Sequence, residues 1–456
     1  MKNDETLERE VRASLRASAA HPIPDDLVAR IGAIPAGQPS SQGTVARLPR
    51  YARIAAELAA AAVVVVAVSA LILARNGGNT PGGPLGPGAT SPATPAASAA
   101  PAAVATPSPA PSASPAETMA PAAVLGLAPA SVTFVSADVG WVLGTGACAS
   151  GPCAAIARTG DGGRTWSPAP APLTAVAEGP GQATSGVSGL RFADTNNGWA
   201  FGPDLWATHD GGTTWAKVTI PGVPADAPVF ALETAGGIVH AAVLDGGDFR
   251  VASSPVGSDG WSVSPVRVPV GAGPVPVVQL VLSGAAGWLV ENDRTVVGGA
   301  RLANGSWVAW TPPCADVVGP AFLAASSPTE LAAACDVGLW SNPTGDHLYL
   351  SHDGGSTFSR SGTAAPLTTA AMAAMASPSA VVVGGSDGTG SVLAATTDAG
   401  RTWKVVARLP AGQIADLGFT TATQGVVIVG GVGGSASLLM TRDGGQTWHA
   451  VAVAGS

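Results

Sequence analysis

The sequence predicts an all-β fold, a seven-bladed β-propeller over residues 124–456, and two repeated patterns carry this prediction. The first is a turn, Ser/Thr-x-Asp-x-Gly-x-Thr-Trp/Phe, whose aspartates stand at positions 161, 210, 353, 398 and 443. Three of the four steps between them are 45 or 49 residues, and the fourth, 143 residues, is close to three such periods. Two copies are therefore eroded rather than absent, which makes seven repeats.

The second pattern is a short apolar phrase, often opened by Gly, that recurs once in each repeat. Its copies are Val139–Val142, Asn197–Ala200, Gly237–Val239, Ala286–Leu289, Glu330–Ala333, Ala380–Val383 and Gln424–Val427. The eroded third and fourth repeats still end in an aromatic residue, Trp261 and Trp307. Four short strands in a period of about 47 residues, repeated seven times, are typical of a β-propeller. A parallel β-helix is the main alternative, but its repeats are shorter.

Each turn has a physical basis in its residues. An Asp side chain accepts hydrogen bonds from the backbone N–H groups that follow it, and Gly supplies a left-handed conformation. Thr and the aromatic residue favour a strand, and the aromatic ring can be buried. We therefore expect structural hairpin turns between the outer strands of the blades, rather than carbohydrate or metal sites. The residues concerned are Asp161, Gly163, Trp166, Asp210, Gly212, Trp215, Asp353, Gly355, Phe358, Asp398, Gly400, Trp403, Asp443, Gly445 and Trp448.

This turn resembles the Asp-box of bacterial neuraminidase-type (BNR) repeats. The propeller region, about 70% of the chain, most resembles Asp-box propellers related to the photosystem II assembly factor group and other exported propellers without catalysis. The resemblance implies the fold and says little about the ligand. Sialidases, the enzymes of this kind, use a tyrosine nucleophile and three arginines that clamp the substrate carboxylate. Here the propeller has one tyrosine, Tyr349, and nothing in the sequence pairs the candidate arginines Arg191, Arg250, Arg267, Arg294 and Arg301. We therefore expect no catalytic residues and keep a sialidase-type glycoside hydrolase as an unfavoured alternative.

The N-terminal part has a different organisation. Residues 1–53 contain short helical patterns and form the expected cytoplasmic segment. Residues 54–75 contain an uninterrupted run of apolar or small residues from Leu58 to Ala74, which is near the lower length limit for a transmembrane helix. Three arginines, Arg47, Arg50 and Arg53, precede the run and only Arg75 follows it. The positive-inside rule then leaves the N-terminus in the cytoplasm and the propeller outside the cell membrane.

We expect this single-pass segment to remain uncleaved as a signal-anchor, because the run begins too far from Met1 for an ordinary signal peptide. Residues 76–123 are rich in Pro, Ala and Gly and cannot bury a core, so we expect a disordered linker. A small cytoplasmic helix pair joined to an anchor, a stalk and an outer domain resembles the layout of membrane-bound anti-sigma regulators. The His-and-Cys zinc motif of that family is absent, so a transmembrane signalling role is an alternative.

Composition excludes some partners and cofactors. Residues 124–456 carry thirteen Lys or Arg against twenty-two Asp or Glu, and nucleic-acid binders need a basic surface. No glycine-rich phosphate loop or paired metal-ligand spacing stands out, so we expect neither a cofactor nor a metal. The four cysteines lack the spacing of a zinc knuckle. Outside the membrane, two local disulfides are expected, Cys148–Cys153 and Cys314–Cys335.

The leading functional prediction is a non-catalytic, membrane-tethered module that binds a protein or a glycan at one end of the propeller channel. The candidate loops are the crossings between blades and the turns between the first strands. The two eroded repeats, residues 223–312, depart most from the pattern, and departure from a repeat indicates that the fold alone no longer dictates the sequence. The candidate binding residues in this sector are Asp245, Asp248, Glu291, Asp293 and Arg294, with Trp288 as an exposed aromatic ring. A protein partner is favoured over a sugar.

Overall fold

The computed structural model describes residues 118–119, 127–148, 151–177, 183–273, 276–315, 319–335, 347–430 and 436–453, which all belong to the compact unit Thr106–Ser456. The predicted cytoplasmic segment, membrane span and nearly all of the linker lie outside these residues and stay predictions. Within the described ranges there is no helix of the length and apolar character needed to cross a bilayer.

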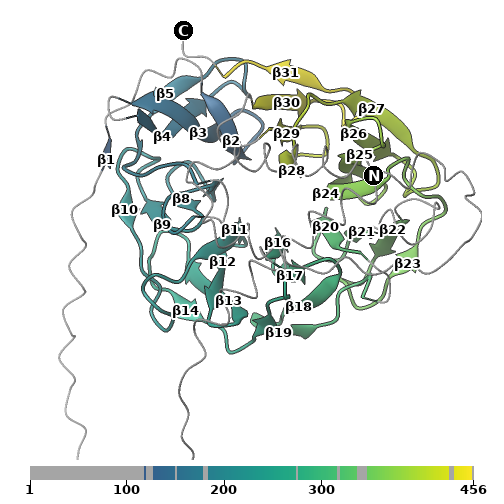
Figure 1. Cartoon of the computed structure of the whole chain (residues 1–456), viewed down its shortest axis with the longest axis horizontal. Helices are drawn as coiled ribbons and strands as arrows, with labels where there is room; N and C mark the ends of the chain where they lie inside the picture. Colours follow the sequence, from purple (N-terminus) through teal and green to yellow (C-terminus); the bar gives the residue numbers. More distant parts are fainter. Residues whose placement is uncertain are drawn as a thin grey trace, which may run out of the picture. The chain divides into compact units, whose positions relative to one another are not determined.

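Seven β-sheets follow one another around a ring, as predicted, with the first strand of each sheet innermost (Figure 1). Each sheet is one blade, built from consecutive antiparallel strands. Blade 1 is β2 (Ala128–Phe134), β3 (Gly140–Cys148), β4 (Gly151–Thr159) and β5 (Ser167–Ala169). Blade 2 is β7 (Gly189–Phe192), β8 (Gly198–Phe201), β9 (Leu205–Thr208) and β10 (Ala216–Lys217). Blade 3 is β11 (Val229–Ala235), β12 (Ile238–Asp245), β13 (Asp248–Pro255) and β14 (Ser262–Val263), with β15 (Val268–Pro269) also paired to β13.

The other four blades repeat this order. Blade 4 is β16 (Val277–Ser283), β17 (Ala286–Asn292), β18 (Val296–Ala303) and β19 (Ser306–Trp310). Blade 5 is β20 (Ala321–Ala325), β21 (Leu331–Cys335), β22 (His347–Ser351) and β23 (Ser359–Arg360). Blade 6 is β24 (Thr369–Ser377), β25 (Ala380–Ser386), β26 (Ser391–Thr396) and β27 (Lys404–Arg408), and blade 7 is β28 (Ile414–Phe419), β29 (Gly425–Val429), β30 (Ser437–Thr441) and β31 (His449–Val451). A separate two-stranded pair joins β1 (Thr118–Met119) to β6 (Ala171–Pro172).

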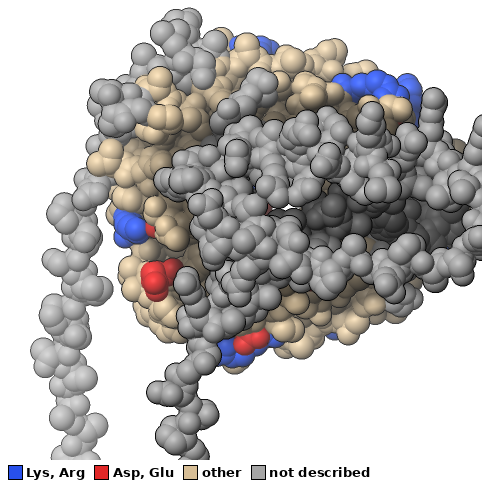
Figure 2. All heavy atoms as spheres, in the orientation of Figure 1, with Lys and Arg blue, Asp and Glu red and all other residues tan. Residues whose placement is uncertain are grey.

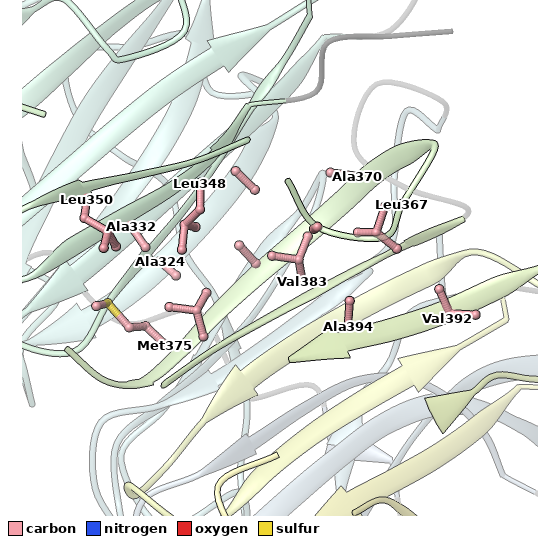
Figure 3. Close-up of a cluster of buried hydrophobic side chains, with 14 residues drawn as sticks. Ala324, Ala332, Leu348, Leu350, Leu367, Ala370, Met375, Val383, Val392 and Ala394 are labelled. Carbon is pink, nitrogen blue, oxygen red and sulfur yellow. The ribbon is translucent and has the colours of Figure 1, made fainter. Parts of the chain in front are cut away.

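The hydrophobic core lies between neighbouring blades. Figure 3 shows the cluster between blades 5 and 6, where Leu348 and Leu350 lie near Met375 and Val383. Small side chains such as Ala332 complete it. Because each blade packs against two neighbours, both faces of its middle strands are buried; every residue of β21 and β29 is buried. This explains why these strands are continuous apolar runs rather than alternating ones.

The five repeated turns, hereafter the aspartate turns, join the third and fourth strands of blades 1, 2, 5, 6 and 7. In blade 1, Asp161 Oδ1 accepts hydrogen bonds from the N–H groups of Arg164 and Thr165 at 3.0 and 2.9 Å. The hydroxyl of Thr159 accepts the N–H of Gly163 at 2.9 Å, and Gly163 has a φ of 83°. The same bonds from hydroxyl and carboxylate recur at the other four turns, which are therefore self-contained caps.

The aromatic residue that ends each aspartate turn packs between its own blade and the preceding one. Trp166 belongs to the core between blades 7 and 1, and Trp215 to the core between blades 1 and 2. Phe358, Trp403 and Trp448 pack against the corresponding cores but remain partly exposed. The turns thus make the capping hydrogen bonds and the ring packing that their residues predict.

One predicted disulfide is present. Cys314 and Cys335 are bonded, with their Cα atoms 5.6 Å apart and a separation of 21 positions in the sequence. Cys153 is also disulfide-bonded. The side chain of its predicted partner, Cys148, lies outside the described residues, so that pairing stays a prediction.

Candidate functional site

The loops of the propeller fall on two opposite faces. Because strands alternate in direction, hairpins between second and third strands share a face with the crossings between blades; we call this the crossing face. Turns between first and second strands share the other face with the aspartate turns, and we call this the turn face. Backbone bonds tie the two kinds of turn together: Gly162 N donates to Asp138 O at 2.8 Å, and Gly211 N donates to Asn196 O at 2.8 Å. The prediction that crossings and first turns form one site is therefore wrong, because they lie at opposite ends of the ring.

The predicted sector is brought together on the crossing face by the crossing from blade 3 to blade 4. Residues Val268 and Pro269 of this crossing pair with β13. Val270 N donates to Gly247 O at 3.0 Å, in the β12–β13 hairpin, and Gly271 N donates to Glu291 Oε1 at 3.2 Å, at the end of β17. One segment thus joins the hairpins of both eroded repeats.

Two aspartates of the sector are neutralised by arginines. Arg250 Nη1 lies 3.2 Å from Asp245 Oδ2, and Arg267 Nη1 lies 3.1 Å from Asp248 Oδ2. Arg267 Nη2 also reaches Asp245 Oδ2 at 3.8 Å. Arg250 donates to the carbonyl of Ser264 at 3.0 Å, which fixes the guanidinium to the crossing. This group is charge-balanced and local.

Glu291 is fully buried beside the same crossing. Its Oε2 atom has no hydrogen-bond partner among the described residues. Burial raises the pKa of the Glu291 carboxyl, the bond from Gly271 opposes this rise, and the charge of Asp293 adds to it. Asp293 packs directly on the crossing backbone, since a Cβ at Gly271 or Gly273 would overlap the Asp293 side chain. Glu291 and Asp293 therefore position the crossing and are not free to meet a partner as a pair of carboxylates.

Two exposed side chains of the sector, Val277 and Arg294, lie near the crossing and are not held in the ion pairs. Val277 begins β16, pairs with Asn292, and is 50% exposed, as one of three large apolar side chains of the described residues that are left open to solvent. Arg294, in the β17–β18 hairpin, is also exposed. Since β16 is an innermost strand, Val277 stands near the end of the central channel.

Trp288 does not belong to this site. It is 1% exposed and its Nε1 atom donates to the carbonyl of Gly354 at 3.0 Å, in the aspartate turn of blade 5. The prediction of an exposed aromatic ring is wrong because Trp288 stands at the start of the second strand, where blade packing covers it.

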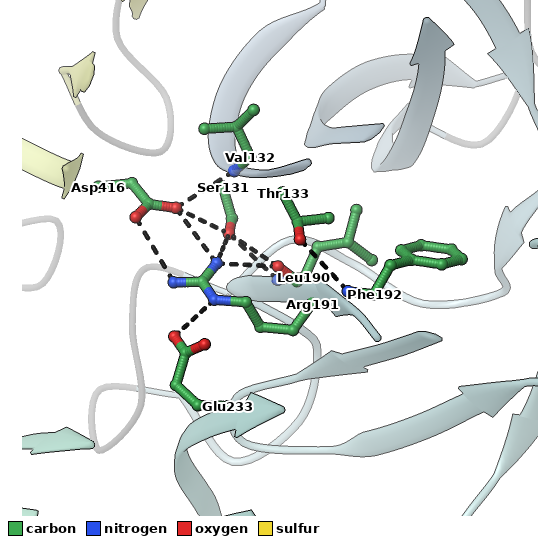
Figure 4. Close-up of polar contacts among 8 residues, drawn as sticks. All are labelled: Ser131, Val132, Thr133, Leu190, Arg191, Phe192, Glu233 and Asp416. Carbon is green, nitrogen blue, oxygen red and sulfur yellow. Dashed lines mark hydrogen bonds and ion pairs between the residues drawn. The ribbon is translucent and has the colours of Figure 1, made fainter. Parts of the chain in front are cut away.

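The channel itself contains a charged cluster that the sequence analysis missed. The first strands of all seven blades line a space of about 380 Å³. Its charged lining residues are Arg191, Glu233 and Asp416, from blades 2, 3 and 7. Figure 4 shows the Arg191 guanidinium between the two carboxylates; Arg191 Nε lies 2.6 Å from Glu233 Oε1, and Arg191 Nη1 lies 3.3 Å from Asp416 Oδ2. Asp416 Oδ2 also accepts the Ser131 hydroxyl at 3.2 Å.

Electrostatics distinguishes the members of this cluster. Burial alone would lower the pKa of Arg191, but the charges of Asp416 and Glu233 outweigh burial and raise it. Burial raises the pKa of Glu233, and Arg191 only partly offsets this. Two carboxylates share one guanidinium, so the charge of Arg191 does not fully offset the burial of Glu233. A charged residue within an otherwise apolar first strand was the available signal, although the sequence could not show which charges meet.

Four of the five arginines considered for a sialidase clamp make contacts in different parts of the ring. Arg191 binds the channel acids, Arg250 and Arg267 bind the blade 3 aspartates, and Arg301 donates to the Ser356 hydroxyl at 2.9 Å. Tyr349 lies on β22, paired with Ala333 and Arg360. The described residues also contain no group of three His, Cys, Asp or Glu side chains able to hold a metal ion.

The surface in view carries little charge. Figure 2 shows the Lys, Arg, Asp and Glu side chains of the described residues as small separate groups toward the rim of the ring. The described surface in this view has no continuous basic area.

No protein-family model matches the chain, and no curated protein matches it. Solved structures match it at low identity. "YCF48 bound to D1 peptide" is 17% identical, over 73% of this chain and 98% of that chain, with a TM-score of 0.49. The β-propeller domain of the trilobed protease from Pyrococcus furiosus is 8% identical, over 72% and 96%, with a TM-score of 0.48. A puromycin-hydrolysing peptidase from Mycobacterium tuberculosis is 14% identical, over 72% and 53%, with a TM-score of 0.48. The propeller assignment rests on the order of the strands in the seven sheets rather than on these similarities.

Proposed function

We propose that this chain is a membrane-anchored, extracytoplasmic propeller that binds a protein partner without catalysis, through the crossing face of blades 3 and 4. The observation that carries the proposal is the exposure of Val277 beside the β17–β18 hairpin that holds Arg294. An apolar side chain left open to solvent, in a sector that also carries an exposed arginine and paired charges, supports a protein-binding surface.

The surroundings of Val277 favour a pre-formed site. The crossing is held by Glu291, by β13 and by the Arg250 and Arg267 ion pairs. A rigid surface loses less conformational entropy when it binds. A glycan partner loses support, because Trp288, the candidate exposed aromatic ring of the sector, is buried.

The membrane part of the proposal rests on the sequence. The apolar run within residues 54–75 and the arginines before it support an anchor whose linker presents the propeller outside the cell. The signalling alternative would need a cytoplasmic partner of residues 1–53, and recovery of such a partner would favour it.

Site-specific photo-crosslinking in the native membrane tests the binding face. A photoreactive residue at position 277 should capture one protein, and the same residue at position 308, which is exposed on the outer strand of blade 4, should not. Purified partner should then bind the wild-type chain and lose at least tenfold in affinity for Val277→Asp and Arg294→Glu, while Val308→Asp binds normally. If Val277→Asp binds the partner as well as the wild type, and loop replacements in blades 6 and 7 abolish binding, the assignment is wrong.

A further inference from the structure

A cavity opens between blades 3 and 4 on the turn face, away from the crossing face. Its volume is about 470 Å³, within the range of small-molecule sites. Apolar side chains of Ile238, Val263, Leu302 and Trp307 line it, together with His240. Its lining includes the exposed residues Ala285 and Ser306, so solvent can enter.

The second strand of blade 3 lacks the tryptophan that three other blades place against the next blade. In blades 1, 2 and 4 a Gly-Trp pair opens this strand, and Trp141, Trp199 and Trp288 are all buried. Each indole fills the space toward the next blade; Trp141, for example, stacks on Phe192 with 3.8 Å between ring centroids. His240 holds the equivalent position in blade 3, as its place after Val239 and the pairing of Val239 with Ser254 show.

The contacts of His240 define its hydrogen-bonding state. Trp307 Nε1 lies 3.2 Å from His240 Nδ1, and the Ser253 hydroxyl lies 2.7 Å from the same atom. An indole N–H can only donate, so Nδ1 must accept and carries no proton. The ring proton of the neutral imidazole is therefore on Nε2, which makes Nε2 a donor. Both hydrogen bonds of His240 involve Nδ1, and among the described residues Nε2 has no partner.

The site is uncharged at neutral pH. His240 is 5% exposed, and burial lowers its pKa to about 4. The remaining lining side chains are serines and apolar residues. A charged ligand would lose its hydration here without meeting an opposite charge.

From these observations we propose that the cavity between blades 3 and 4 binds a flat, uncharged aromatic molecule, which occupies the space that an indole fills in three other blades and accepts a hydrogen bond from His240 Nε2. The ring of Trp307, whose centroid lies 5.5 Å from that of His240, forms the adjoining part of the wall. This site is independent of the protein-binding face proposed above.

Calorimetric titration of the full-length chain in detergent tests the proposal, with indole-3-carboxaldehyde as the probe. This probe carries an indole-sized ring and a carbonyl acceptor. His240→Trp introduces the residue of blades 1, 2 and 4 and should weaken binding at least tenfold. Ala285→Leu narrows the cavity from its exposed rim and should do the same, even if His240→Trp fails to fold. Val308→Ala, on the same blade but outside the cavity, should bind like the wild type.

Two further ligands test the chemistry. Indole, which lacks an acceptor, and indole-3-carboxylate, which is charged, should each bind at least tenfold more weakly than the aldehyde. Absence of aldehyde binding to the wild type, equal binding to Ala285→Leu, or tighter binding of the carboxylate would each overturn the proposal.

Discussion

The charged cluster in the channel should stabilise the closure of the ring between the last blade and the first. The first and last blades consist of consecutive strands, β2–β5 and β28–β31, so no shared sheet joins them. Asp416 of blade 7 instead accepts bonds from Val132 N and the Ser131 hydroxyl of blade 1, each at 3.2 Å, and pairs with Arg191 of blade 2. Asp416→Ala removes all of these contacts at once.

The expected loss follows from the number and burial of those contacts. Hydrogen bonds to charged groups contribute about 1.5–3 kcal/mol, and breaking a buried ion pair costs about 3–5 kcal/mol. Arg191 keeps Glu233 and its side chain is 22% exposed, so the full cost is not reached. We expect Asp416→Ala to lower the free energy of unfolding by about 2–4 kcal/mol.

Guanidinium unfolding followed by tryptophan fluorescence measures this loss. Hydrogen exchange should rise in β2 and β28 before the other strands, because the contact between blades 1 and 7 opens first. The matched control is Asp226→Ala, at an exposed position in the crossing from blade 2 to blade 3. Equal stability of Asp416→Ala and Asp226→Ala would refute the idea that Asp416 stabilises the closure of the ring.

Glu233 supplies a second test of this cluster, because its carboxyl should contribute less to stability at neutral pH than the carboxyl of Asp416. A carboxyl whose pKa is raised in the folded state binds its proton more tightly there than in the unfolded chain. Its contribution to stability is therefore complete at low pH and is lost as pH rises through the folded pKa. Because burial raises the pKa of Glu233, Glu233→Gln should cost much less than Asp416→Ala at pH 7, or stabilise the fold. A larger loss for Glu233→Gln would contradict this account.

Four other predictions concern the blades and the anchor. Trp215→Ala should cost about 3–5 kcal/mol because Trp215 is fully buried, and Trp403→Ala should cost less because it is partly exposed; chemical unfolding compares them. Hydrogen bonds from Thr402 lower the pKa of Asp398 to about 2, so its stabilising effect should be present at neutral pH and disappear as pH falls from about 4 toward 2; melting of Asp398→Asn and wild type should differ at pH 7 and converge at pH 2. Cys335→Ser should cost about 2–4 kcal/mol, and reductant should lower the melting temperature of the wild type more than that of this variant, which keeps only the disulfide of Cys153. Protease added to intact cells should remove the propeller and leave a small membrane-bound N-terminal fragment; a mature chain beginning beyond residue 75 would contradict the anchor.

The elements that the sequence predicted well are those set by local chemistry. The hydrogen bonds of an aspartate turn lie within a few residues, as at Thr159 and Asp161, so its five copies can be recognised from the sequence alone. The second strands are equally local, because apolar runs flanked by turns are typical of buried strands. Their number and spacing were enough to predict seven blades.

The features that the sequence did not predict depend on closure of the ring. Arg191 and Asp416 are 225 residues apart in sequence, and only closure of the ring brings them together. Trp288 was predicted to be exposed from its position in an irregular repeat. It is buried because the packing of the next blade, through Gly354, decides its environment.

The departures in blades 3 and 4 have different consequences at the two ends of the ring. On the turn face, both blades lack the aspartate turn, and a cavity lined by His240 lies between them. On the crossing face, the same repeats bring the charged hairpins onto one crossing and leave Val277 open to solvent. The ring tolerates both changes because Trp261 and Trp307 still bury their rings between blades. Packing is therefore kept in these two repeats while their surface features change, which is the pattern that the proposed binding roles require.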